Sequence, residues 1–320
     1  MKSSLLTSVA AHPKRRGKAL AALAAVGIAT LTLAGCTGGS ESGTMLRGDE
    51  AFARGEIAEA LAEYRLALAQ GDPSAPILAR AAHAYTATGR ISEAVEHYRE
   101  AVALDPELAD LAASDLLKFA REAIREGDGL QATEAVSAAM VLRQGVGTEG
   151  IALPVARHLV RTGRHERALP FFVQAARESN DSPEVLYEQA LAYDEAGRCE
   201  NALVLFDRAW GRLTVAQRAD ADWRTGSCSM QLGARVLEEG DLEAALGYFD
   251  ITIELGEPRG QIPDAWFQRG EILILKEECM AALQAFEEVL LADPAPGLRA
   301  RAEDRVEVLR FPQRGGDGPC

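Results

Sequence analysis

Two stretches of the sequence repeat one pattern: ARGEIAEALAEYRLAL (53–68) and ATGRISEAVEHYREAVALDP (87–106). In each stretch a glycine ends one run of helix-forming residues and opens another, and Gly55 and Gly89 lie 34 positions apart. Glycine readily adopts the positive φ angle with which many helices end. The pattern therefore predicts pairs of helices, each joined by a short turn and repeated along the chain.

The unit recurs seven times, at steps of 34, 38, 36, 34, 43 and 37 residues, and the turn position is held by Gly55, Gly89, Gly127, Gly163, Gly197, Gly240 and Glu277. An alanine follows each turn by five residues, at Ala60, Ala94, Ala132, Ala168, Ala202, Ala245 and Ala282. Four residues further stand Tyr64, Tyr98, Val136, Phe172, Phe206, Phe249 and Phe286. Seven residues before the turn stand Gly48, Ala82, Ala120, Ala156, Ala190, Gly233 and Gly270. Small residues at fixed places let two antiparallel helices approach closely, and the large residue fills the space beside that contact.

This pattern resembles the tetratricopeptide repeat (TPR) family, a helix–turn–helix of 34 residues. The last unit shows it most fully, with Trp266, Gly270, Ala282, Phe286 and the pair Asp293-Pro294. The resemblance covers about residues 45–295 and implies an all-α fold, a right-handed α-solenoid of about seven units. Nine extra residues precede the sixth unit, around GRLTVAQRAD (211–220). Either the first helix of that unit is long or the superhelix breaks there.

After the last unit, residues 296–311 predict one more helix, because Leu298, Ala302, Val306 and Leu309 form an apolar stripe on a polar helix. A solenoid requires such a terminal helix with a polar outer face, so we expect it to cap the repeats. Residues 312–320 are rich in Gly and Pro, and we expect a disordered tail.

The N-terminal 35 residues have the pattern of a signal peptide. A basic cluster at Lys14–Lys18 precedes an apolar run of about 16 residues, too short for a membrane span. The run ends in Leu33-Ala34-Gly35-Cys36, which resembles the lipobox of bacterial lipoproteins. The resemblance implies cleavage before Cys36, lipid attachment to it, and a location at the bacterial cell envelope. No Asp follows Cys36, which favours the outer membrane, facing the periplasm. Residues 36–44 are rich in Gly, Ser and Thr and predict a flexible tether.

The charge of the chain bears on its partners. The first 35 residues hold five bases and no acid, so the remaining chain carries 29 bases against 48 acids, a net charge of −19 instead of −14. Binding to a phosphate backbone needs clustered Lys and Arg, so we expect no nucleic-acid partner.

A search for reactive or metal-binding patterns identifies none. GVGTEG (145–150) matches a dinucleotide-binding glycine pattern, but it joins two helical units and follows no strand. The histidines show no paired ligand spacing. We therefore expect no enzymatic activity, cofactor or metal. Because Cys199 begins one helix and Cys228 lies about 18 Å along another from its turn, a bridge between them is doubtful. We expect Cys199, Cys228 and Cys279 to be buried free thiols, whereas Cys320 could pair with any other cysteine.

In TPR proteins the first helices of the units line a concave groove that binds peptides. Carried over to this chain, the resemblance predicts a groove lined by Arg80, His83, Arg157, Arg161, Tyr187, Glu188, Asp194, Met230, Gln231, Phe267, Gln268 and Glu271. Arg80 and His83 do not reproduce the Lys/Asn/Arg clamp of the chaperone-tail-binding TPRs. For each of these residues plain solvent exposure is the competing explanation.

Two functions are compatible with the sequence. The first is a lipid-anchored scaffold that binds other envelope proteins through the groove, similar to the general class of TPR lipoproteins that assemble β-barrels or pili. The alternative is a solute- or glycan-binding lipoprotein that serves an exporter or transporter. Stacking of sugars on clustered aromatic residues would favour the alternative, but Tyr187 and Phe267 lie two repeats apart.

Overall fold

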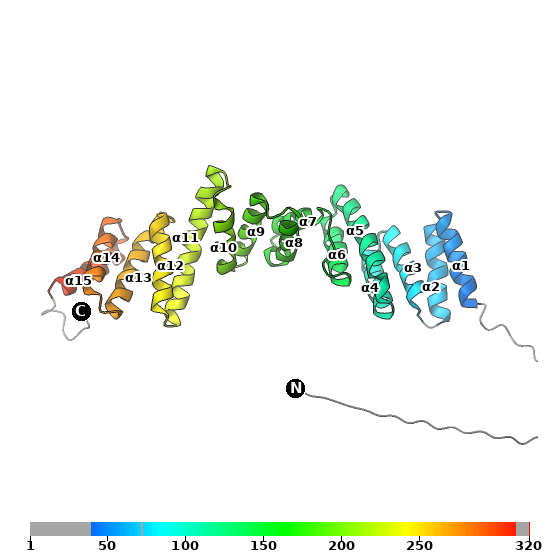
Figure 1. Cartoon of the computed structure of the whole chain (residues 1–320), viewed down its shortest axis with the longest axis horizontal. Helices are drawn as coiled ribbons and strands as arrows, with labels where there is room; N and C mark the ends of the chain where they lie inside the picture. Colours follow the sequence, from blue (N-terminus) through cyan, green and yellow to red (C-terminus); the bar gives the residue numbers. More distant parts are fainter. Residues whose placement is uncertain (1–39, 72, 312–319) are drawn as a thin grey trace, which may run out of the picture. The chain divides into compact units, whose positions relative to one another are not determined.

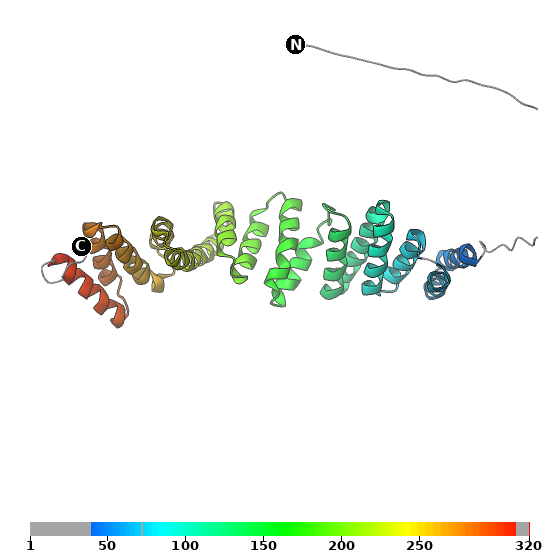
Figure 2. The ribbon, with the colours of Figure 1, turned by 90° about the horizontal axis from the view of Figure 1, so that it is seen from below.

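The computed structural model describes residues 40–71, 73–311 and 320. The chain divides into two units at Gly39, and Cys36, the signal segment and residues 312–319 lie outside the described residues. From Ser40 onward the described fold is helical, and successive helices pack in antiparallel pairs, each pair beside the next (Figure 1). The view turned by 90° shows the same succession (Figure 2).

The helices of the described part have the following bounds. The first three predicted units are α1 Ser40–Ala53 with α2 Ile57–Gln70, α3 Ala75–Ala87 with α4 Ile91–Leu104, and α5 Ala109–Glu126 with α6 Gly129–Leu142. The next two are α7 Ala152–Arg161 with α8 His165–Glu178, and α9 Pro183–Glu195 with α10 Cys199–Trp210. The last are α11 Val215–Glu238 with α12 Leu242–Leu255, α13 Ile262–Leu275 with α14 Cys279–Leu291, and the single helix α15 Pro296–Arg310. Short 3-10 turns, η1 Pro106–Leu108 and η2 Arg259–Gln261, precede α5 and α13.

The turn between the two helices of each unit has the predicted backbone. All six turn glycines have φ between +70° and +87°. Glu277, which stands in the glycine place of the seventh unit, has φ +60°. An L-residue with a side chain rarely adopts this conformation, so Glu277 keeps the turn at a cost in backbone energy.

The predicted small and large positions form the core of each pair. All seven alanines that follow the turn are fully buried. The aromatic side chain then packs against the small residue of the facing helix: a Cβ added to Gly48 would lie 2.5 Å from Tyr64, and one added to Gly233 would lie 2.9 Å from Phe249. The spacing thus reflects direct packing between helices.

The described helices α1, α11 and α15 bear on three predicted segment boundaries. The nine extra residues lengthen a helix, since α11 has 24 residues. The capping helix is present as α15. At the other end, α1 begins at Ser40, inside the expected tether of residues 36–44. Polar residues at the start of a helix have the same composition as a linker, so composition alone does not distinguish the two.

The expectation of free thiols at Cys199, Cys228 and Cys279 is wrong. Disulfides join Cys199 to Cys228, with Cα atoms 5.2 Å apart, and Cys279 to Cys320, with Cα atoms 5.5 Å apart. The distance of about 18 Å separates Cys228 from the turn of its own unit, at Gly240, and does not determine how far Cys228 lies from Cys199. Because α11 is long, it continues past the preceding turn, and its middle lies beside Cys199. Cys320 is therefore fastened to the start of α14 instead of ending a free tail.

Candidate functional site

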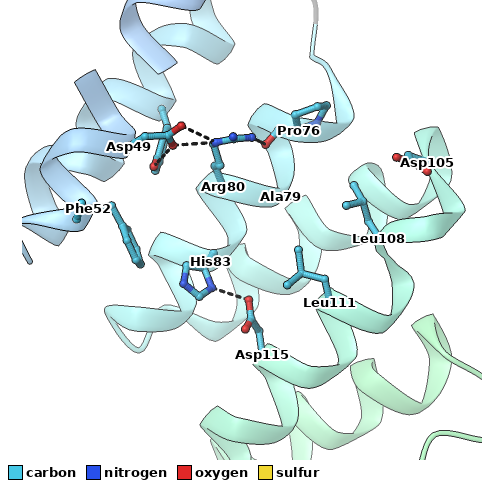
Figure 3. A pocket seen from close by; sticks show the side chains of 12 residues that line it. Asp49, Phe52, Pro76, Ala79, Arg80, His83, Asp105, Leu108, Leu111 and Asp115 are labelled. Atoms are coloured by element: carbon cyan, nitrogen blue, oxygen red, sulfur yellow. Dashed lines mark hydrogen bonds and ion pairs between the residues drawn. The ribbon is translucent and has the colours of Figure 1, made fainter. Parts of the chain in front are cut away.

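A cavity of about 470 Å³ opens between α1, α3 and the start of α5 (Figure 3). Its apolar walls come from Phe52, Ala53, Pro76, Ala79, Leu108 and Leu111. Leu111 is about half exposed (49 %) although it is a large apolar residue in a folded helix. A concave apolar surface with a few fixed polar groups is the usual form of a ligand site.

Arg80 is fixed at one side of the cavity by an ion pair. Its Nε donates to the carboxylate of Asp49 on α1 at 2.8 Å, and Asp49 also accepts from the Tyr64 hydroxyl at 2.8 Å. Burial and the hydrogen bond to Asp49 raise the pKa of Tyr64, so the phenol stays protonated and donates. Three helices are thereby joined at this point, and the guanidinium is oriented along the cavity wall.

His83 holds the other side through a second carboxylate. His83 Nδ1 lies 2.5 Å from Asp115 Oδ2, and the Tyr98 hydroxyl donates to the same oxygen at 2.5 Å. Burial alone would raise the pKa of the Asp115 carboxyl, but the hydrogen bonds from His83 and Tyr98 outweigh it and hold that pKa below its usual value. The ring of His83 also packs against Phe52, with centroids 4.8 Å apart and the two ring planes tilted by 42°. These two contacts hold the His83 ring in place at the wall of the cavity.

A second cavity of about 550 Å³ adjoins the first and shares Phe52, His83 and Asp115 with it. Its far wall on α5 carries three bases, Lys118, Arg121 and Arg125, and one acid, Glu122. Arg121 pairs with Glu149 and Arg125 with Glu122, whereas Lys118 makes no ion pair with any residue that the structure describes. We call the two cavities together the α1–α3–α5 groove. It offers an apolar half and a basic half to one extended ligand.

The other predicted groove residues are mostly engaged with the neighbouring repeat. Arg157 binds Glu188 at 2.7 and 2.6 Å, and Glu271 binds Arg305 of α15 at 2.7 and 2.9 Å. The Tyr187 hydroxyl donates to Asp220 at 2.7 Å, and burial together with this bond raises the pKa of Tyr187 to about 12. Asp194 binds Arg224 on α11 at 2.5 Å. These contacts form a series of pairs between first helices, each spanning about one repeat.

The remaining predicted residues do not form a site together. Phe267 is buried (2 % exposed) and lies beneath the guanidinium of Arg301, which is 4.1 Å from the ring centroid. Met230 packs against the core of α12 and α13. Arg161 and Gln231 are exposed, and Gln268 is half-buried. Of the twelve predicted groove residues, only Arg80 and His83 line the α1–α3–α5 groove.

Sequence reasoning missed the third unit's contribution to the groove. Arg80 and His83 stand nine and six residues before their turn glycine, and the same positions before Gly127 are held by Lys118 and Arg121. Applying the repeat alignment to every unit would have found both. Leu111 and Phe52 carry no comparable signal, because exposed apolar residues in a helix are common.

The GVGTEG loop lies between α6 and α7, as an inter-repeat connection. Its backbone forms an anion-binding turn, but Glu178 of α8 occupies it. Thr148 N–H and Gly150 N–H donate to the Glu178 carboxylate at 2.5 and 3.0 Å, and the Thr148 hydroxyl donates at 2.8 Å. An internal carboxylate thus stands where a phosphate would have to bind.

One grouping of metal-ligand atoms occurs among the described residues, Asp194 with Cys199 and Cys228. The two sulfur atoms are bonded to each other, so neither is a thiolate donor in this state. None of the described helices is both long and apolar enough to cross a bilayer.

Comparison with known families bears on the repeat itself. A family model described as tetratricopeptide repeat matches residues 47–215, more than half of the chain. The chain belongs to the tetratricopeptide repeat family. Within this TPR protein the match ends at the start of α11, where the extra residues lie. None of the curated proteins compared with the chain matches it.

Several solved TPR structures are similar to this chain at low sequence identity. YrrB, a TPR protein described as having an unusual peptide-binding site, is 20% identical, with 64% of this chain and 97% of that chain covered and a TM-score of 0.31. A tetratricopeptide repeat protein from Parabacteroides merdae is 13% identical, with coverages of 85% and 99% and a TM-score of 0.30. The TPR2AB domain of yeast Sti1, solved as a complex with pHSP90, is 14% identical, with coverages of 85% and 99% and a TM-score of 0.30.

Proposed function

We propose that this TPR protein is a lipid-anchored scaffold of the bacterial envelope that binds an extended peptide segment of another envelope protein. The observation that carries the proposal is the α1–α3–α5 groove, whose two adjoining cavities share Phe52, His83 and Asp115. The apolar half would hold a large apolar side chain of the peptide, and the basic half would face a carboxylate near Lys118. Arg80 and His83 are fixed by their own carboxylate partners, so the groove is formed before a ligand arrives.

One observation supports the envelope location. The two disulfides fit an oxidising compartment, where such bonds form and persist. The short distance along the chain from Cys36 to Ser40, four residues, spans about 14 Å at full extension. A lipid on Cys36 would keep the first repeat, and the groove that begins on it, close to the membrane surface. The ligand is then a membrane-proximal segment of its protein.

The glycan-binding alternative requires exposed aromatic rings for sugar stacking. Phe267, one of its two aromatic residues, is buried beneath Arg301. Tyr187, the other, is bound to Asp220 through its hydroxyl. The two aromatic residues on which the alternative rests therefore do not offer a pair of exposed faces on which a sugar ring could stack.

Site-specific photocrosslinking in intact cells tests peptide binding. A benzophenone amino acid replaces Leu111, which lines the groove, or Val141, an apolar residue on α6 that is more exposed (67 %) and lies outside the groove. We expect a defined crosslinked protein from position 111 and none from position 141. Ala53→Arg, at an exposed position of the cavity wall, should abolish the crosslink by filling the cavity. Equal crosslinking at both positions, or a crosslink that survives Ala53→Arg, would argue against the groove.

The anchor needs a separate measurement. Mass spectrometry of the mature N-terminus should find a chain that begins at an acylated Cys36. An unmodified Cys36, or a chain that begins elsewhere, would remove the lipid anchor from the proposal and leave the groove untouched.

A further inference from the structure

The apolar packing of the described helices changes along α11. One continuous apolar cluster extends from Ala51 through the first five units and reaches only Ala221 of α11. Beyond that residue, Cys199, Cys228 and Leu232 form a small cluster of their own. Further clusters centre on Phe249 and on Phe286. The continuous hydrophobic core therefore ends early in α11.

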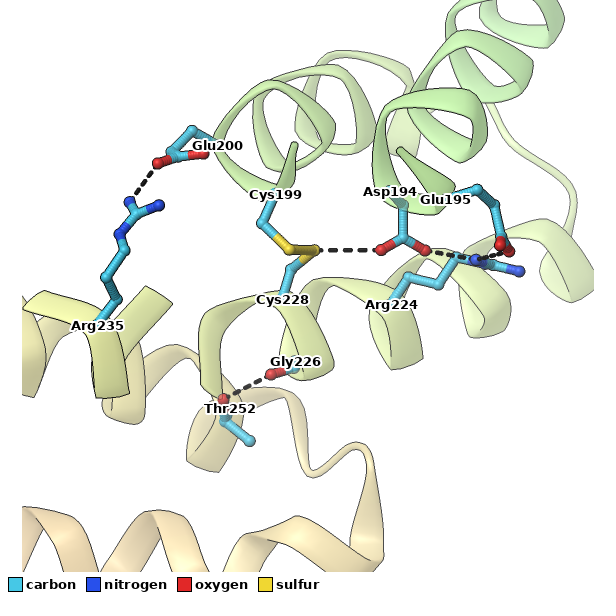
Figure 4. Close-up of a disulfide and its surroundings, with 9 residues drawn as sticks. All are labelled: Asp194, Glu195, Cys199, Glu200, Arg224, Gly226, Cys228, Arg235 and Thr252. Atoms are coloured by element: carbon cyan, nitrogen blue, oxygen red, sulfur yellow. Dashed lines mark hydrogen bonds and ion pairs between the residues drawn. A yellow bond between two sulfur atoms is a disulfide. The ribbon is translucent and has the colours of Figure 1, made fainter. Parts of the chain in front are cut away.

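Polar contacts account for most of the remaining junction (Figure 4). Arg224 on α11 binds Asp194 at 2.5 Å and Glu195 at 3.1 Å, and Arg235 pairs with Glu200. Arg235 and Glu200 are each about half exposed, at 52% and 49%. An exposed ion pair such as Arg235–Glu200 adds little to stability. The Arg224–Asp194 pair is mostly buried, with 22% and 17% of the two side chains exposed, so it contributes more. The apolar contact at this point is confined to the small cluster around Cys199, Cys228 and Leu232.

The Cys199–Cys228 disulfide lies where the continuous apolar core ends. It joins Cys199, the first residue of α10, to Cys228 in the middle of α11, and both side chains are buried, with 4% and 0% exposed. Asp194 Oδ1 lies 3.3 Å from Cys228 Sγ, which carries no proton in the disulfide, so the disulfide and the Arg224 pair meet at one carboxylate (Figure 4). The bridge is the covalent connection across a break in the core.

We propose that the Cys199–Cys228 disulfide is a covalent clasp that couples two blocks of the TPR protein, α1–α10 and α11–α15, into one cooperative unit. The clasp holds the start of α10 against the middle of α11, beside the contacts that Tyr187 and Asp194 of α9 make with α11. A partner that contacts both blocks then meets one continuous surface.

The second disulfide provides the matched control. Cys279 and Cys320 are only half-buried, and their bond fastens the chain end to α14 within the second block. It crosses no junction between the blocks. Removal of this bond should affect the end of the chain and leave the coupling unchanged.

The test follows unfolding of the mature protein in increasing urea by pulsed hydrogen–deuterium exchange, helix by helix. In the oxidised protein we expect α1–α10 and α11–α15 to lose protection at the same urea concentration. In Cys199→Ser/Cys228→Ser the second block should lose protection at least 1 M urea earlier than the first. In Cys279→Ser/Cys320→Ser the two blocks should still unfold together, α15 excepted. Coincident unfolding of the blocks in Cys199→Ser/Cys228→Ser would overturn the clasp.

A second arm avoids variants that fail to fold. The wild-type protein is folded and oxidised first, then treated with a trialkylphosphine, which takes up the oxygen of one water molecule and leaves two thiols for each disulfide reduced. Iodoacetamide then caps the thiols, and mass spectrometry reports which bond has opened. We expect Cys279–Cys320 to open first with no change in coupling, and separate unfolding of the blocks only once Cys199–Cys228 has opened. Unchanged coupling after both bonds are reduced would equally refute the proposal.

Discussion

The ring of Phe286 lies against the backbone of Gly270 on the facing helix, so closely that a Cβ on Gly270 would be 2.7 Å from Cζ of the ring. Phe286 itself is fully buried. The same relationship joins Tyr64 to Gly48 and Phe249 to Gly233. In these three units a large side chain on the second helix packs against a position without a side chain on the first, whereas the other four units have alanine at that position.

Gly270→Ala should therefore destabilise the protein although alanine is the better helix former. The added methyl forces Phe286 to move, and overpacking of this kind costs about 1–3 kcal/mol. Gly247→Ala on α12 is the matched control, because nothing lies within 4 Å of its Cβ position. That change should stabilise by about 0.5–1 kcal/mol. Urea denaturation measures both, and a stabilised Gly270→Ala variant would contradict the packing described.

Glu277→Gly should stabilise the seventh unit. Glu277 has φ +60° at the turn position that glycine holds in the other six units, and a residue with a Cβ pays about 1–2 kcal/mol there. Relief of that strain exceeds the entropy cost of glycine in the unfolded chain, so we expect a net gain of about 1 kcal/mol. Gly240→Ala, at φ +87°, should show the opposite sign in the same thermal unfolding measurement. If Glu277→Gly instead loses stability, contacts of the Glu277 side chain outweigh the strain of its backbone conformation.

Asp115→Asn should lower stability in a pH-dependent manner. The hydrogen bonds from His83 and Tyr98 hold the folded-state pKa of Asp115 below its unfolded value of about 3.9. The ionised carboxylate therefore stabilises fully above that pH, and its contribution disappears as the pH falls through the folded-state pKa. Hydrogen bonds to a charged group are worth about 1.5–3 kcal/mol. The difference in free energy of unfolding between wild type and variant should be of that order at pH 7 and shrink below pH 4; a difference independent of pH would exclude this origin.

Glu178→Ala should loosen the connection between α6 and α7. The variant leaves the N–H and hydroxyl of the fully buried Thr148 without their acceptor, which costs about 1–3 kcal/mol. Hydrogen exchange at Thr148 and Gly150 should accelerate more than at the turn of α3 and α4, the internal reference. Glu178→Gln keeps an acceptor oxygen and should give an intermediate effect. Unchanged exchange at Thr148 in Glu178→Ala would mean that the loop holds its shape alone.

The repeat could be predicted from the sequence because its determinants are local and periodic. Gly55, Ala60 and Tyr64 occupy fixed positions within a unit, and each acts within its own helix pair. The sequence pattern does not determine the length of α11, because nine additional residues fit either a longer helix or a break in the superhelix. The structure shows that they extend the helix.

The contacts between units were not predictable in the same way. Cys228 meets Cys199 only because α11 is offset from the unit before it, and the sequence contains no measure of that offset. Likewise, the pairing of Phe267 with Arg301 depends on where α15 lies. The groove was found in part: Arg80 and His83 were predicted, whereas Phe52 and Leu111 become recognisable only when the helices are placed side by side.

The pairing of Arg80 with Asp49 limits what charge can contribute to binding. A ligand carboxylate that approached Arg80 would displace Asp49 and exchange one half-exposed ion pair for another, with little net gain in free energy. The gain must come from apolar surface removed from water in the cavity, at about 25 cal/mol per Å². Affinity at this end of the groove should then increase with the size of the bound side chain and vary little with ionic strength.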